Sequence, residues 1–155
     1  NANNQTAVLA LDSSSTLVTM DFQGEPTKKQ IGPWNGGSII SFDRARQQNA
    51  SRIIVIDNKK LEVLGLPTGE PLFEFTFTQQ VDDRPQYFNS GSGGDLLGIA
   101  SRENSLIYLF DEKGGIFPGF PIEALPQFYY GKIDYNSGNY LLCVRRDRKL
   151  YAFKN

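Results

Sequence analysis

The sequence has no histidine among its 155 residues and contains only one cysteine, one tryptophan and one methionine. The lack of histidine excludes histidine-based catalytic triads, histidine-ligated zinc and histidine general bases. The single cysteine excludes an internal disulfide. Because Cys143 lies within an apolar run, we interpret it as a buried structural thiol and not as a nucleophile.

The chain also lacks an excess charge and a long apolar run. Sixteen basic and seventeen acidic residues give a net charge of −1, so no global field attracts nucleic acid or an anionic membrane. No apolar run approaches the roughly 18 residues of a membrane span, and no signal-peptide pattern opens the sequence. Residues 1–2, Asn-Ala, resemble the remnant of a cleaved tag, so we expect residues 3–155 to come from a longer protein.

What the chain does contain is typical of a globular β-protein: 39% hydrophobic residues, 15 glycines and 8 prolines. The clearest stretch is residues 52–77. Residues 53–56 are a β-branched run, which predicts a strand buried on both faces. Turn residues follow at 57–60 and 67–70, and residues 72–77 alternate apolar and polar. No window shows the spacing of an amphipathic helix.

This strand and turn pattern repeats along the chain. Leucines that open equivalent strands recur about every 45 residues, as do glycines in the turns that follow. They are Leu17, Leu61, Leu106 and Leu150, with Gly24, Gly69 and Gly114. A unit of four short strands and about 40–45 residues is typical of a propeller blade. The sequence therefore predicts an all-β fold, a β-propeller or a partial propeller.

The predicted blades cover residues 3–37, 38–84, 85–126 and 127–155. Inner strands are expected at 38–42, 86–89 and 128–133, and outer strands at 25–31, 72–77 and 115–122, with an irregular edge around the prolines of 117–121. Only the two middle blades are complete, since the first lacks its inner strand and the last its outer one. The chain is then either a segment of a larger ring or a partial propeller that self-associates through its incomplete ends.

One hairpin carries a family resemblance. Residues 56–64, followed by Thr68 and Gly69 and ending at Phe73, resemble the repeats of PQQ-like and WD40-like β-propellers. Residues 119–121, Gly-Phe-Pro, are similar to repeats of bacterial cell-surface propellers. The resemblance implies architecture and an extracytoplasmic place, in the periplasm or at the cell surface. The vicinal cysteines of quinoprotein dehydrogenases are missing, which argues against a bound quinone and for the non-enzymatic envelope relatives.

Two candidate sites stand out near the C-terminal end. Asp134 and Asn136 place oxygen ligands at alternate positions, which resembles a calcium loop of FG-GAP-type propellers, although a hairpin turn explains them equally well. We expect no cofactor, and calcium is the one ion that the sequence brings into consideration. The aromatic residues Tyr129, Tyr130 and Tyr135 are candidate anchors for a partner, with packing between blades as the alternative.

No catalytic constellation is present, so we predict no catalytic residues. The sequence predicts a non-catalytic binding or scaffold module that uses propeller loops for protein or glycan partners, with no nucleic acid and no membrane span. The alternative is a fragment of a larger propeller enzyme whose catalytic residues lie in other blades. The charged runs at 82–84 and 145–149 are interpreted as a solvated loop and a solvated turn.

Overall fold

The computed structural model describes residues 6–21, 23–34, 36–44, 51–89, 94–134 and 138–154. Within these ranges the chain forms strands and turns and no helix, which confirms the predicted all-β class. The strands of the first two sheets are β1 (Thr6–Leu11), β2 (Thr16–Asp21), β3 (Pro26–Gln30), β4 (Ile39–Arg44), β5 (Ser51–Asp57), β6 (Lys60–Gly65) and β7 (Glu70–Thr76). Those of the last two sheets are β8 (Gln86–Asn89), β9 (Asp95–Ser101), β10 (Leu106–Phe110), β11 (Ile122–Glu123), β12 (Phe128–Lys132), β13 (Asn139–Val144) and β14 (Leu150–Lys154).

The strands form four antiparallel sheets in chain order. The first sheet is β1-β2-β3, the second β4-β5-β6-β7, the third β8-β9-β10-β11 and the fourth β12-β13-β14. Each strand pairs with the next one along the chain, so every sheet is a simple meander. Two four-stranded sheets lie between two three-stranded ones, as the repeat predicts.

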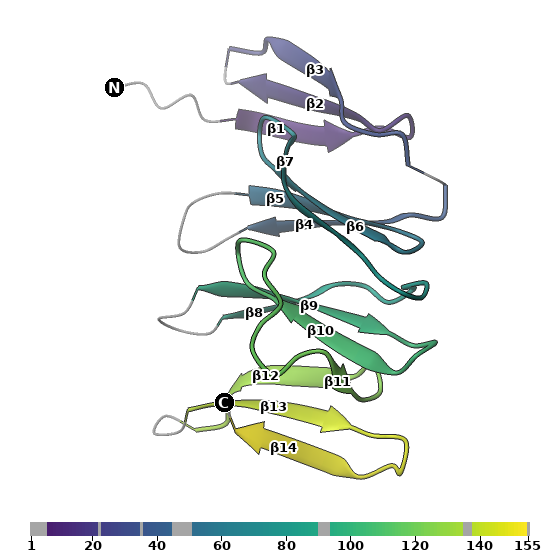
Figure 1. The fold of residues 1–155 in the computed structure, drawn as a ribbon. Coiled ribbons are helices and arrows are strands. Elements are labelled where there is room, and N and C mark those ends of the chain that lie inside the picture. The colour runs from purple at the N-terminus through teal and green to yellow at the C-terminus, as the bar shows by residue number, and fades with distance from the viewer. Residues whose placement is uncertain are drawn as a thin grey trace.

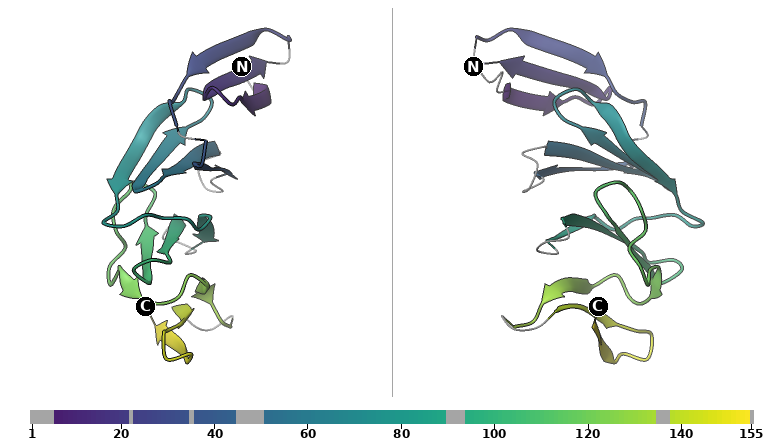
Figure 2. Two further views of the ribbon diagram at one scale, coloured as in Figure 1. Left: turned by 90° about the vertical axis from the view of Figure 1, so that its right-hand side faces the viewer. Right: turned by 60° about the vertical axis from the view of Figure 1, so that its left-hand side comes forward.

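The four sheets are stacked face to face from the N-terminal to the C-terminal end of the molecule (Figure 1). Seen from the side, the stack follows an arc (Figure 2, left). The first strands of the later sheets, β4, β8 and β12, lie on the concave side, and β3, β7 and β11 lie on the convex side. We call β4, β8 and β12 the inner strands. The arrangement is compatible with part of a propeller.

Three apolar clusters hold the stack together, one in each gap between sheets. Strand β5 contributes to two of them. Ile53 and Val55 pack toward the first sheet, while Ile54 and Ile56 pack toward the third, and none of the four is more than 1% exposed. The prediction of a strand buried on both faces is therefore confirmed, and successive side chains supply two separate cores.

The repeated glycines occupy the turns expected of them. Gly24, Gly69 and Gly114 have φ angles of +87°, +66° and +83°, a backbone region that glycine enters without a steric penalty. In the first and third of these turns, the carboxylates of Asp21 and Asp111 each accept two backbone N–H bonds. The same turn chemistry thus follows β2 and β10.

The outer strand predicted at 115–122 is wrong. Only β11 is a strand there, and a single bridge joins Phe110 to Ile116. Pro118 and Pro121 have no N–H to donate to a ladder, so the segment turns away from β10 instead of pairing along it. The irregular edge expected at 117–121 is what the structure has.

The repeat also shifts by one residue in the third sheet. Leu17 and Leu61 face the following sheet and belong to the clusters that lie there. Leu106 opens β10 as predicted, but it packs back against the second sheet, and Ile107 faces forward. Ile107, paired with Ala100, is therefore the structural equivalent of the other leucines.

Candidate binding site

Exposed apolar side chains gather on the inner strands. Of the eight large hydrophobic side chains that are exposed in the described part of the chain, five lie on these strands or directly after β12. They are Ile40, Phe42, Tyr87, Tyr129 and Ile133. Phe42 and Tyr129 are 51% and 47% exposed. Concentrated exposure of this kind is typical of an interaction surface, whereas single exposed residues need no explanation.

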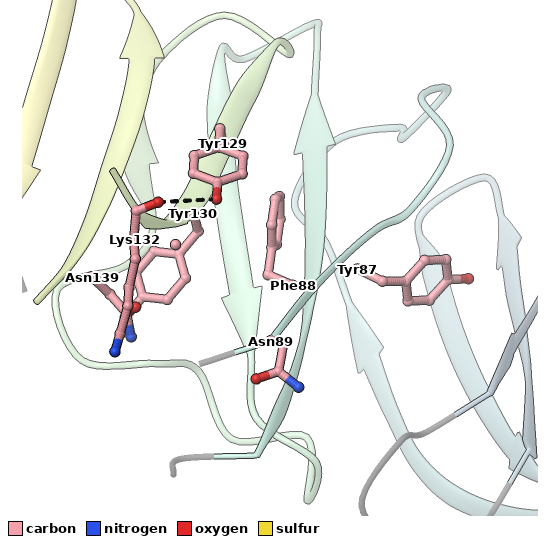
Figure 3. Close-up of a pocket in the computed structure, with 8 residues that line it drawn as sticks. Tyr87, Phe88, Asn89, Tyr129, Tyr130, Lys132 and Asn139 are labelled. Carbon is pink, nitrogen blue, oxygen red and sulfur yellow. Dashed lines mark hydrogen bonds between the residues drawn. The ribbon is translucent and has the colours of Figure 1, made fainter. Parts of the chain in front are cut away.

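The concave surface is hollowed between β8 and β12. The hollow has a volume of ≈ 450 Å³ and is shown in Figure 3. Its lining comes from three strands, β8, β12 and the start of β13. The lining residues are Tyr87, Phe88, Asn89, Tyr129, Tyr130, Gly131, Lys132 and Asn139.

Aromatic rings form the floor of this hollow. The ring of Phe88 lies 5.3 Å from that of Phe128 and meets Tyr129 edge-on at 6.2 Å. Gly98, in the neighbouring strand β9, makes room for them. A Cβ atom at this position would lie 2.6 Å from Cζ of Phe128 and 2.7 Å from Cε2 of Phe88. The glycine in an otherwise apolar strand therefore marks a close approach of side chains.

Tyr129 stands at the rim of the hollow. Its hydroxyl donates a long hydrogen bond of 3.4 Å to the carbonyl oxygen of Lys132 (Figure 3). The ring folds over Gly131, where a Cβ atom would lie 2.6 Å from the tyrosine oxygen. Gly131 thus sets the position of a large, half-exposed ring whose polar end is anchored to the backbone of its own strand.

Tyr87 points away from Phe88, since consecutive side chains alternate along β8 (Figure 3). Its hydroxyl donates a 2.8 Å hydrogen bond to Oγ of Ser41 on β4. Burial raises the pKa of Tyr87, because it disfavours the ionised phenolate. The bond connects the inner strands of the second and third sheets.

A buried ion pair joins β4 to β5. Arg52, 4% exposed on β5, forms an ion pair with Asp43 on β4, including a 3.2 Å bond from Nε. The two residues are cross-strand partners in the ladder. Because the Arg52 guanidinium is buried, its charge-assisted bonds to Asp43 fix β4 against β5.

The structure brings some of the predicted site residues together and leaves others apart. Tyr129 and Tyr130 both line the hollow, but they lie on opposite faces of β12. Tyr129 is exposed, whereas Tyr130 is 2% exposed and belongs to the apolar cluster between the third and fourth sheets. Asp134 is exposed just after β12. Tyr135 and Asn136 lie outside the described residues. Within the described ranges, no three acidic or cysteine side chains come together as a metal site would require.

The charged runs make local contacts. Asp83 forms an ion pair of 2.7 Å with Arg102. In the turn after β13, the guanidinium of Arg145 lies 4.8 Å from the ring centre of Tyr151, and the Tyr151 hydroxyl donates to Asp147 at 2.6 Å. These contacts organise a loop and a turn, and Asp83 and Arg145 are only partly exposed, so neither run is as fully solvated as expected.

Sequence reasoning missed Phe42, Tyr87 and Phe88. A signal was available, because each predicted inner strand carries at least one aromatic residue. What the sequence does not contain is the approach of β8 to β12, about 40 residues apart, and this approach forms the hollow.

No family model matches the sequence, and a search of curated proteins finds no match. Among the described residues, no helix is long and apolar enough to cross a membrane.

Proposed function

We propose that this chain is a non-catalytic binding module of the β-propeller type, and that it binds a protein segment along its inner strands. The observation that carries the proposal is the gathering of exposed Phe42, Tyr87 and Tyr129 on one concave surface. The repeat of about 45 residues and the curved stack of meander sheets support the propeller assignment. The absence of histidine and of a catalytic constellation in the sequence supports a binding role.

A protein segment suits this surface for two reasons. The exposed rings and aliphatic side chains come from the inner strands of three sheets, and tyrosine and phenylalanine are effective anchors for partner side chains. In addition, β4, β8 and β12 are edge strands of their sheets. Edge strands present backbone N–H and C=O groups, which an extended peptide recognises through main-chain hydrogen bonds.

The hollow between β8 and β12 would select one side chain of that segment. Its ≈ 450 Å³ volume and aromatic floor suit a bulky apolar group, and pockets of about 300–1,000 Å³ are usual for small ligands. Lys132 at the rim adds a positive charge beside the aromatic floor. The partner segment would therefore carry an aromatic or large aliphatic residue flanked by an acidic one.

The resemblance to PQQ-like propellers supports a place in the bacterial envelope, in the periplasm or on the cell surface. It also supports a scaffold role among the non-enzymatic members of that family. This location follows from the resemblance and is part of the proposal.

The test is a selection followed by titration. Twelve-residue peptides are selected from a random displayed library, synthesised and titrated against the chain by calorimetry, while a glycan array is screened in parallel. Tyr129→Ser and Phe42→Ser should each weaken peptide binding at least tenfold, which corresponds to about 1.4 kcal/mol. Leu72→Ser is the matched control, because Leu72 on the outer strand β7 is 51% exposed, as is Phe42.

Two outcomes would contradict the proposal. One is an equal loss of peptide affinity in the Leu72→Ser control. The other is glycan binding, without peptide binding, that Tyr129→Ser removes, since it would assign the same surface to carbohydrate.

A further inference from the structure

The two ends of the stack carry the two halves of an interface that occurs three times inside the chain. We propose that a second copy of this chain packs its first sheet on the outward face of the fourth sheet, so that two chains close one ring. The inference concerns assembly and is tested at positions outside the proposed peptide site.

The first observation is an exposed leucine at a position that is otherwise buried. Leu17, Leu61 and Ile107 face the next sheet in the stack and are 1%, 0% and 0% exposed. Leu150 is the equivalent residue of the fourth sheet and is 70% exposed. The position is apolar in all four sheets, and among the described residues no sheet covers it in the fourth.

The residues that surround Leu150 on the outward face of the fourth sheet are also apolar. Tyr151 and Phe153 pack inward against the third sheet, so the alternate residues of β14 face outward. In the ladder, Leu150 lies opposite Val144, and Ala152 lies opposite Leu142. Four neighbouring apolar side chains thus form one outward patch, in the positions that Ile54, Ile56, Leu61 and Val63 fill in the second sheet, where all four are buried.

The first sheet offers the complementary face. Leu9, Leu11 and Leu17 pack against the second sheet, so Val18 and Met20 of β2 face the other way. Ala10 pairs with Val18 in the ladder and is exposed on this same side. Faces with this orientation cover the preceding sheet elsewhere in the stack, as Ile53, Val55 and Leu64 of the second sheet do.

The geometry favours a closed ring over an open chain. A contact between two different faces forms rings or filaments, depending on whether the rotation between copies closes. The stack curves, with its inner strands on the concave side (Figure 2), so each added copy continues the same arc. Two chains supply eight sheets, which lies at the upper end of the roughly four to eight blades of propellers. The expected assembly is a head-to-tail dimer.

Sedimentation velocity of the full chain over a hundredfold range of concentration tests this assembly. The unaltered chain should sediment as a dimer that dissociates on dilution without forming larger species. Leu150→Asp and Val18→Asp should each give a monomer with an unchanged far-ultraviolet circular dichroism spectrum. Leu72→Asp, which places the same charge on the exposed outer strand, should leave the dimer intact.

Mixing the two monomeric variants gives the sharpest result. One undamaged head-to-tail contact remains in the mixture, between Leu150 of one variant and Val18 of the other, so a dimer should return. Should Val18→Asp fail to fold, Ala10→Asp on the same exposed face replaces it. Three results would overturn the proposal: a monomeric unaltered chain at all concentrations, species that grow steadily with concentration, or a dimer unaffected by both Val18→Asp and Ala10→Asp, which would indicate contact between two fourth sheets.

Discussion

The second and fourth sheets carry apolar residues at matching ladder positions but lie in different surroundings. In the second sheet both faces are covered, and Ile53 to Ile56 are all buried. In the fourth sheet one face packs against the third sheet, while the other leaves Leu150 70% exposed. The comparison shows that position in the stack, and not the local pattern, decides whether a residue serves as core or as surface.

The largest expected effect comes from truncating the same position in the two sheets. Leu61→Ala should destabilise the chain by about 2–5 kcal/mol, because it empties a fully buried site. Leu150→Ala should change stability by less than about 0.5 kcal/mol in the monomer, since its side chain is mostly in water. Urea unfolding at a concentration where the chain is monomeric measures both. Equal losses of unfolding free energy in the two variants would show that the two positions do not differ in burial as described.

An intermediate effect is expected where the third and fourth sheets meet. Gly98→Ala forces a Cβ atom against the rings of Phe88 and Phe128 and should cost about 1–3 kcal/mol. Near-ultraviolet circular dichroism should change as the rings move. Gly36→Ala is the control, because no atom lies within 4 Å of the added carbon and its φ is not positive. A Gly98→Ala chain as stable as the control would show that the rings yield freely.

The smallest effect is expected at the turn that leads into β14. The hydrogen bond from Tyr151 lowers the pKa of Asp147 below its ordinary value of 3.8. A lowered pKa in the folded state adds stability above pH 3.8, and this contribution is lost as the pH falls through the folded value. The stability difference between the unaltered chain and Tyr151→Phe should therefore shrink on acidification. A carboxyl titration followed by NMR should show the Asp147 pKa rising in Tyr151→Phe, and no change would exclude the bond as its cause.

Much of the fold could be predicted because the repeat depends on residues that act locally within each hairpin. β-branched runs, turn carboxylates and glycines of positive φ set each hairpin, so the inner strand at 86–89 has the predicted bounds. The outer strand at 115–122 failed because two prolines removed its donors. The shift from Leu106 to Ile107 escaped prediction because fixed spacing cannot show which way a side chain faces.

The candidate site could be predicted only in part. Tyr129 was singled out as an anchor and is exposed at the rim of the hollow. The hollow itself depends on β8 and β12 lying side by side, with Gly98 and Gly131 giving space to the rings. Contacts between residues so far apart in sequence arise from stacking, which the pattern of one strand does not contain.

The most direct test of the proposed function is to map the contact surface of a selected peptide on the chain labelled with nitrogen-15. Amide shift changes on titration should cluster on β4, β8 and β12 and include Tyr87 and Tyr129. The Leu150→Asp monomer should give the same map, because its substitution lies on the end face. Shift changes confined to the outer strands β3 and β7, or to the turns at the sheet ends, would contradict binding along the inner strands.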